Sequence, residues 1–126
     1  MFKVKYFIML LIFSMMNFVT LKAEQLWEST WGTIRVIEDG EVVKAVYDDK
    51  KDGFIILNYS SGDIFKGFWI KTTSDKKCRT KKLNERTGKK SAYWGNFTVK
   101  ATDTQFVGLW GYCKRKPTEK WTGKIK

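Results

Sequence analysis

Residues 91–110 read SAYWGNFTVKATDTQFVGLW, and they carry twice the motif that decides the fold: a glycine with a bulky residue two positions before and after it. Strand side chains alternate between two faces, so the three residues of each motif lie on one face. Alternating large and small side chains fill the interior of small β-barrels. The motif therefore predicts the inward face of a barrel. The copies are Phe65-x-Gly67-x-Trp69, Tyr93-x-Gly95-x-Phe97, Phe106-x-Gly108-x-Trp110, Trp121-x-Gly123-x-Ile125 and, with alanine replacing glycine, Val43-x-Ala45-x-Tyr47.

Short runs of turn-forming residues divide the chain into seven or eight strands. Asp39-Gly40 between two alternating apolar runs is a strong hairpin signal. Short connections make consecutive strands antiparallel, and closing the sheet removes the exposed edges of an aromatic-rich surface. The sequence therefore predicts an all-β fold, a single antiparallel up-and-down β-barrel, with a two-sheet β-sandwich as the alternative. The expected strands are 26–31 (separate, or part of the next), 32–38, 41–47, 54–59, 64–71, 91–100, 105–113 and 121–126.

The first 23 residues have the pattern of a secretory signal peptide. Lys3 and Lys5 precede an apolar run of 14 residues, 6–19, and the small residue Ala23 comes just before a polar stretch. This pattern predicts cleavage after Ala23, a barrel domain over residues 24–126, and a periplasmic or secreted protein without a transmembrane segment. The alternative is an uncleaved membrane anchor, for which the run is short of the roughly 20 residues that span a bilayer.

Cysteine and histidine content restricts the chemistry. Cys78 and Cys113 are the two cysteines, and an even count in a small exported domain favours a disulfide between them. The chain has no histidine, so we expect no metal site and no cofactor. It also has no serine elbow or phosphate loop, so we expect no catalytic residues. Two turn carboxylates that converge at one rim are the remaining catalytic alternative.

Positive charge is concentrated in the second half of the chain. The formal net charge is +11, and residues 24–63 carry −5 whereas residues 64–126 carry +13. Strands 64–71 and 105–113 are two apart in a meander and end at the same rim, so the disulfide would tether the loop 72–90 there. We expect this loop to bind an anionic surface, a polysaccharide or a protein partner; a solvated loop that maintains solubility is the alternative. Its cations are Lys76, Lys77, Arg79, Lys81, Lys82, Arg86, Lys89 and Lys90.

Nucleic acid is an unlikely partner for this loop, because we expect the protein to be exported and no aromatic residue for base stacking lies between Thr72 and Lys90.

Two further surfaces remain open as binding sites. Trp27 and Trp31 are expected to line a barrel mouth that takes a small apolar ligand, although the many bulky inward residues favour a filled interior. Alternation also places five apolar residues on the outer face of three strands, where they form a dimer or partner surface unless the N-terminal segment or the basic loop covers them. They are Phe68, Ile70, Trp94, Val107 and Leu109.

The mature chain resembles a loose class of small exported bacterial β-proteins, whose strands end in Gly-x-Trp and which close with a Trp-x-Gly-basic element. The matching residues run from Trp31-Gly32-Thr33-Ile34 to Trp121-Thr122-Gly123-Lys124. The opening Trp27-x-x-x-Trp31-Gly32 and the run Ala45-Val46-Tyr47 are also similar to the start of avidin-type and lipocalin-like barrels. The basic loop has no counterpart in the avidin pattern, and no biotin-site residues can be placed. The resemblance implies a barrel and a binding role.

We therefore expect an exported, non-catalytic binding protein that engages an anionic partner through its basic loop. A small-ligand carrier and a structural or assembly module, in the form of a homodimer, are the alternatives.

Overall fold

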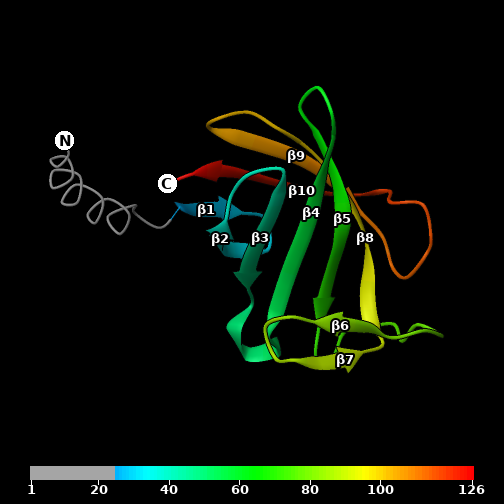
Figure 1. The fold of residues 1–126 in the computed structure, drawn as a ribbon. Helices are drawn as coiled ribbons and strands as arrows, with labels where there is room; N and C mark the ends of the chain where they lie inside the picture. Colours follow the sequence, from blue (N-terminus) through cyan, green and yellow to red (C-terminus); the bar gives the residue numbers. More distant parts are fainter. Residues whose placement is uncertain (1–24) are drawn as a thin grey trace, which may run out of the picture.

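The computed structural model describes residues 25–126, and the predicted signal peptide at residues 1–23 lies outside this range. Eight strands form a closed barrel, and a short two-stranded hairpin lies beside one end of it (Figure 1). The barrel strands are β1 (Gln25–Ser29), β2 (Gly32–Glu38), β3 (Val42–Tyr47), β4 (Gly53–Ser61), β5 (Ile64–Lys71), β8 (Tyr93–Ala101), β9 (Gln105–Trp110) and β10 (Glu119–Ile125). The hairpin is β6 (Lys82–Asn84) and β7 (Lys89–Ser91), and a single 3-10 turn, η2, covers Asp49–Lys51.

Every neighbouring pair of barrel strands is antiparallel, in the order β1-β10-β9-β8-β5-β4-β3-β2. The chain runs up and down around the barrel, and β1 closes it by pairing with β10, with Trp27 opposite Ile125. The predicted up-and-down barrel is confirmed, and the β-sandwich alternative is wrong. Within residues 25–126, no helix is long and apolar enough to cross a membrane.

Several bulky residues of the repeated motif pack inside the barrel, whereas the last of them, Ile125, is 37 % exposed. Tyr47, Trp69, Phe97, Phe106 and Trp121 all belong to the buried core. Two of the motif glycines lie where a neighbouring aromatic ring needs space. A methyl group at Gly108 would lie 2.5 Å from the Phe97 ring, and one at Gly123 would lie 2.5 Å from the Phe106 ring.

A second, smaller core lies on the outside of the barrel, beneath the basic loop. The predicted disulfide between Cys78 and Cys113 is present, and both cysteines pack against Trp94. The Trp94 indole N–H donates a hydrogen bond to the Thr80 carbonyl in that loop, at 2.9 Å. The disulfide therefore holds the loop against the outer wall.

This arrangement decides between the alternatives for the predicted outer apolar patch, because the basic loop covers part of it. Trp94 is 1 % exposed and Ile70 is 0 % exposed, because the loop covers them. Phe68 is half-buried and lies beneath the Lys82 ammonium group, 4.9 Å from its ring centroid. Only Val107, at 51 %, and Leu109, at 40 %, remain well exposed. The five residues do not form one continuous exposed surface, because the disulfide-tethered loop covers Ile70 and Trp94.

Candidate functional site

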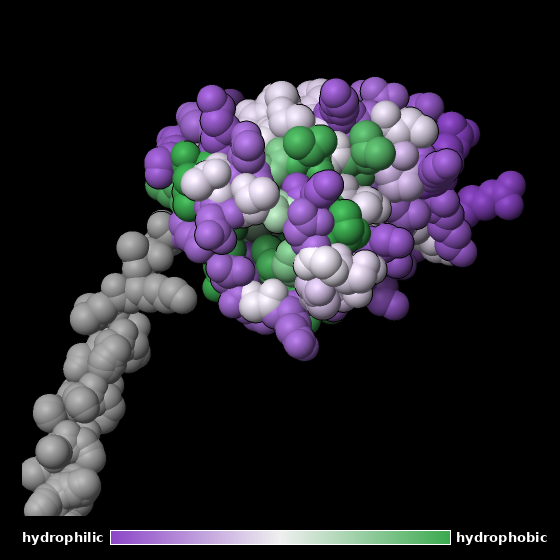
Figure 2. Space-filling view, turned by 90° about the horizontal axis from the view of Figure 1, so that it is seen from above, coloured by the Kyte–Doolittle hydropathy of each residue, from purple (hydrophilic) through white to green (hydrophobic). Residues whose placement is uncertain are grey.

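The two ends of the barrel differ, and one of them, which we call the open end, contains an apolar cavity. This open end carries the β2–β3, β4–β5 and β8–β9 turns. Its cavity has a volume of about 320 Å³, and its walls come from the inward residues of β1, β2, β3, β4, β5, β8 and β9. Figure 2, which views the molecule from above, shows apolar surface recessed among polar side chains. Most of the wall is aliphatic or aromatic, including Ile34, Val36, Ile55, Leu57, Phe65 and Val99.

Stacked aromatic rings separate this cavity from the other end of the barrel. The Phe97 and Trp121 rings are parallel-stacked, with centroids 4.7 Å apart, and Tyr47 lies 5.0 Å from Trp121. Phe97 faces the open-end cavity, whereas Tyr47 and Trp121 face the other end. The filled interior that we expected is therefore present only in the middle of the barrel, and both ends are hollow.

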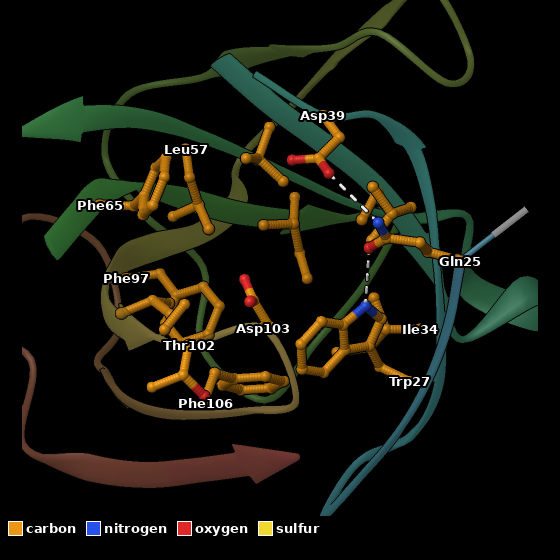
Figure 3. Close-up of a pocket in the computed structure, with 16 residues that line it drawn as sticks. Gln25, Trp27, Ile34, Asp39, Leu57, Phe65, Phe97, Thr102, Asp103 and Phe106 are labelled. Atoms are coloured by element: carbon orange, nitrogen blue, oxygen red, sulfur yellow. Dashed lines mark hydrogen bonds between the residues drawn. The ribbon is translucent and has the colours of Figure 1, made fainter. Parts of the chain in front are cut away.

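Polar side chains at the rim of the open-end cavity form a short hydrogen-bonded chain (Figure 3). The Trp27 indole N–H donates to the Gln25 amide oxygen at 3.2 Å, and the Gln25 amide N–H donates to the Asp39 carboxylate at 3.2 Å. Asp103, in the β8–β9 turn, directs its carboxylate into the cavity. Within residues 25–126, neither carboxylate forms an ion pair.

The cavity at the opposite end is smaller and mainly aromatic. It has a volume of about 170 Å³, and four tryptophans and two tyrosines contribute to its lining, together with Lys51, Lys71, Ser74 and Asp75. Burial, assisted by the nearby Asp75 carboxylate, raises the pKa of the Tyr112 hydroxyl. The Trp110 indole N–H is buried and has no hydrogen-bond partner within residues 25–126.

The predicted pairing of Trp27 and Trp31 at one mouth is wrong. Trp27 lines the open-end cavity, whereas Trp31 is 53 % exposed and lines the aromatic cavity. Trp27 lies within β1, whereas Trp31, four residues later, lies in the turn between β1 and β2 at the aromatic end of the barrel. The two tryptophans are close in sequence, but β1 carries the chain from one end of the barrel to the other, so they line different cavities.

Three of the eight predicted loop cations contact other residues of the folded protein. Arg86 donates to the Tyr47 and Gly53 carbonyls and pairs with the Asp49 carboxylate at 2.6 Å, which lowers the pKa of Asp49. The Lys82 ammonium group lies over the Trp94 ring at 4.6 Å, and that of Lys76 lies over the Tyr112 ring at 5.3 Å. These contacts attach the loop to the barrel.

The other five cations, Lys77, Arg79, Lys81, Lys89 and Lys90, are exposed and form no ion pair within residues 25–126. Four of them line one groove of about 470 Å³ beside the hairpin, which we call the basic groove: Lys77, Lys81, Lys89 and Lys90. Asp52 is the acidic residue in its lining, and its carboxylate accepts a hydrogen bond from Thr72 at 3.2 Å. The groove thus gathers about half of the predicted basic set.

The rim residues of the open-end cavity were missed as site residues. Asp39 and Asp103 both occur at turn signals, where an acidic residue is explained by backbone geometry alone. A signal was nevertheless available, because inward-facing strand residues lie within three positions of each aspartate, Val36 before Asp39 and Ala101 before Asp103. Within residues 25–126, no three acidic or cysteine side chains gather in a group that would hold a metal ion.

No protein-family model, curated protein or solved structure matches this chain, so its function is argued from the geometry of the barrel.

Proposed function

We propose that this protein is an exported, non-catalytic binding protein that carries a small apolar ligand in the open-end cavity. The observation that carries the proposal is the cavity itself: about 320 Å³ of space lined mainly by apolar side chains, within a closed barrel. Small-molecule sites usually measure roughly 300–1,000 Å³, with mostly apolar walls and a few polar groups. Barrels of about eight strands have room for one small ligand.

Small side chains in the wall of the cavity also support a binding role. Protein interiors normally pack closely, and lost packing contacts destabilise the fold. Here the inward positions that line the cavity include the small residues Ala45 and Ala101, where larger apolar side chains would fill the space. The disulfide is compatible with an oxidising compartment, which supports a periplasmic or secreted location.

The test uses N-phenyl-1-naphthylamine, an uncharged dye whose fluorescence rises in apolar surroundings. We expect saturable fluorescence enhancement with the unmodified protein and its loss in Ala101→Trp, because the indole would occupy the cavity mouth. Val107→Trp is the matched control, since Val107 lies on the neighbouring strand with its side chain exposed on the outside. Equal enhancement in Ala101→Trp and Val107→Trp would contradict the proposal.

A second candidate function, favoured by the basic groove, is binding of an anionic partner. Four lysines without acidic partners would attract phosphate, sulfate or carboxylate groups, with an affinity that falls as salt screens them.

Retention on immobilised heparin tests this idea by comparing two variants of equal charge. Replacing Lys77, Lys81, Lys89 and Lys90 by glutamine should sharply lower the salt concentration needed for elution. Replacing four exposed lysines elsewhere, Lys66, Lys100, Lys114 and Lys124, should lower it less. Equal losses would indicate an effect of net charge alone.

A further inference from the structure

The charged groups around the open-end cavity are all of one sign. Among residues 25–126, Asp39 and Asp103 are the charged residues of its lining, and no lysine or arginine of this range contributes to it. The absence of basic residues is notable in a chain with 24 lysines and arginines and a net charge of +11. Because basic residues outnumber acidic ones in this chain, 24 to 13, a cavity mouth with typical charged residues would include lysine or arginine.

Strand alternation explains why basic residues are excluded. Lys44, Lys100 and Lys124 lie on barrel strands near this end, and each follows or precedes an inward-facing residue. Their side chains therefore point outside the barrel. Lys44 pairs with Glu85 at 2.9 Å on the outer surface. The two carboxylates, by contrast, lie in turns and reach over the rim.

The two carboxylates approach the mouth from opposite sides. Asp39 lies in the turn between β2 and β3, and Asp103 lies in the turn between β8 and β9. In the strand order of the closed barrel, these two turns are half a circuit apart. Figure 3 shows Asp103 directed into the cavity and Asp39 held by Gln25 at its edge. A positively charged group at the mouth would thus be attracted from both sides.

Two aromatic rings reinforce this preference. Trp27 and Phe106 line the cavity with their ring centroids 5.8 Å apart. A cation over the face of an indole or phenyl ring is attracted by the negative face of the π-system. The apolar wall below these rings would accept an alkyl or aryl body.

We infer that the open-end cavity binds an apolar cation, an amine or quaternary ammonium compound whose charged group lies between Asp39 and Asp103 and whose apolar part enters the barrel. This inference rests on the proposed function, since it names the class of ligand for the same cavity. The overall positive charge does not prevent such binding, because charges more than about 8 Å apart are screened at physiological salt.

The experiment compares three probes with the same octyl chain, namely octylammonium, 1-octanol and octanoate, by calorimetric titration at neutral pH. We expect octylammonium to bind about fivefold to tenfold more tightly than octanol, because the Asp39 and Asp103 carboxylates attract its ammonium group across a partly solvated mouth, where the attraction is weakened by water. Octanoate should bind most weakly.

Two double variants with the same change in net charge test the assignment. Asp39→Asn combined with Asp103→Asn should abolish the preference for octylammonium while leaving the affinity for octanol unchanged. Glu41→Gln combined with Asp63→Asn should keep the preference, because these carboxylates lie at the same end but outside the cavity lining.

The outcomes distinguish the inferred ligand class from the proposed function. Saturable binding of all three probes without a preference for the cation would overturn the inference about charge and leave the cavity as a binding site. A preference that survives in the Asp39→Asn, Asp103→Asn variant would also overturn it. If none of the three probes bound saturably, the proposed function itself would be wrong.

Discussion

Individual glycines determine where the aromatic rings of this barrel lie. Gly108 on β9 and Gly123 on β10 each leave space that an inward aromatic ring occupies, Phe97 over the first and Phe106 over the second. Phe97 in turn forms the floor of the open-end cavity by stacking on Trp121. The glycine at position 108 thus sets the position of the Phe97 ring, and this ring sets how deep the cavity is.

Gly108→Ala should destabilise the protein, because the added methyl group would lie 2.5 Å from the Phe97 ring and 3.2 Å from the Trp121 carbonyl oxygen. Inserting a methyl group into a packed interior costs about 1–3 kcal/mol. Urea denaturation measures the change in the free energy of unfolding. Gly40→Ala is the control, since nothing lies within 4 Å of its added methyl group, and it should change stability by at most about 0.5 kcal/mol. Equal stabilities of the two variants would contradict this account of the motif.

At the residue scale, the sequence predicted the inward residues but not the rim of the site. Period-two alternation places Tyr47, Trp69 and Phe97 inside from local pattern alone. The roles of Asp39 and Asp103 depend on two turns 64 residues apart in the sequence meeting across the same mouth. That relation exists only once the barrel has closed.

The positions of the barrel strands were predicted well from the sequence, whereas the β6–β7 hairpin was not predicted. β2 (Gly32–Glu38) and β5 (Ile64–Lys71) have the predicted bounds, because turn residues flank regular alternation. The β6–β7 hairpin was predicted only as a charged loop, since it has little apolar alternation. Tertiary contacts hold it instead: Arg86 bonds the Tyr47 and Gly53 carbonyls, and the Asn84 side chain donates to the Asp52 carbonyl at 2.9 Å.

The disulfide connects these elements and explains the outer core. It joins two cysteines 35 residues apart in the sequence, and closure of such a loop contributes about 4 kcal/mol on the chain-entropy model. It also keeps the loop over Trp94 and Ile70, which would otherwise expose an apolar surface to water. The sequence predicted the pairing from the even cysteine count in a small exported domain, but it left open whether the loop covered this face.

The whole molecule presents two chemically different surfaces on one barrel. The open end combines an apolar cavity with two carboxylates, and the hairpin region gathers unpaired lysines in the basic groove. The opposite signs of charge would let each region bind its own class of partner. The closed barrel was predictable from the motif, whereas the cavity was not. Whether a barrel end is filled depends on the combined volumes and rotamers of residues from seven strands.

The most direct test of the central claim, that the open end of the barrel receives a small ligand, is isotope-edited NMR of methyl-labelled protein with 1-octanol. We predict intermolecular NOEs from the octyl chain to the methyl groups of Val36, Ile55, Leu57 and Val99, which line the cavity. NOEs confined to the exposed Val107 and Leu109, or no saturable contact at the cavity residues, would contradict the claim.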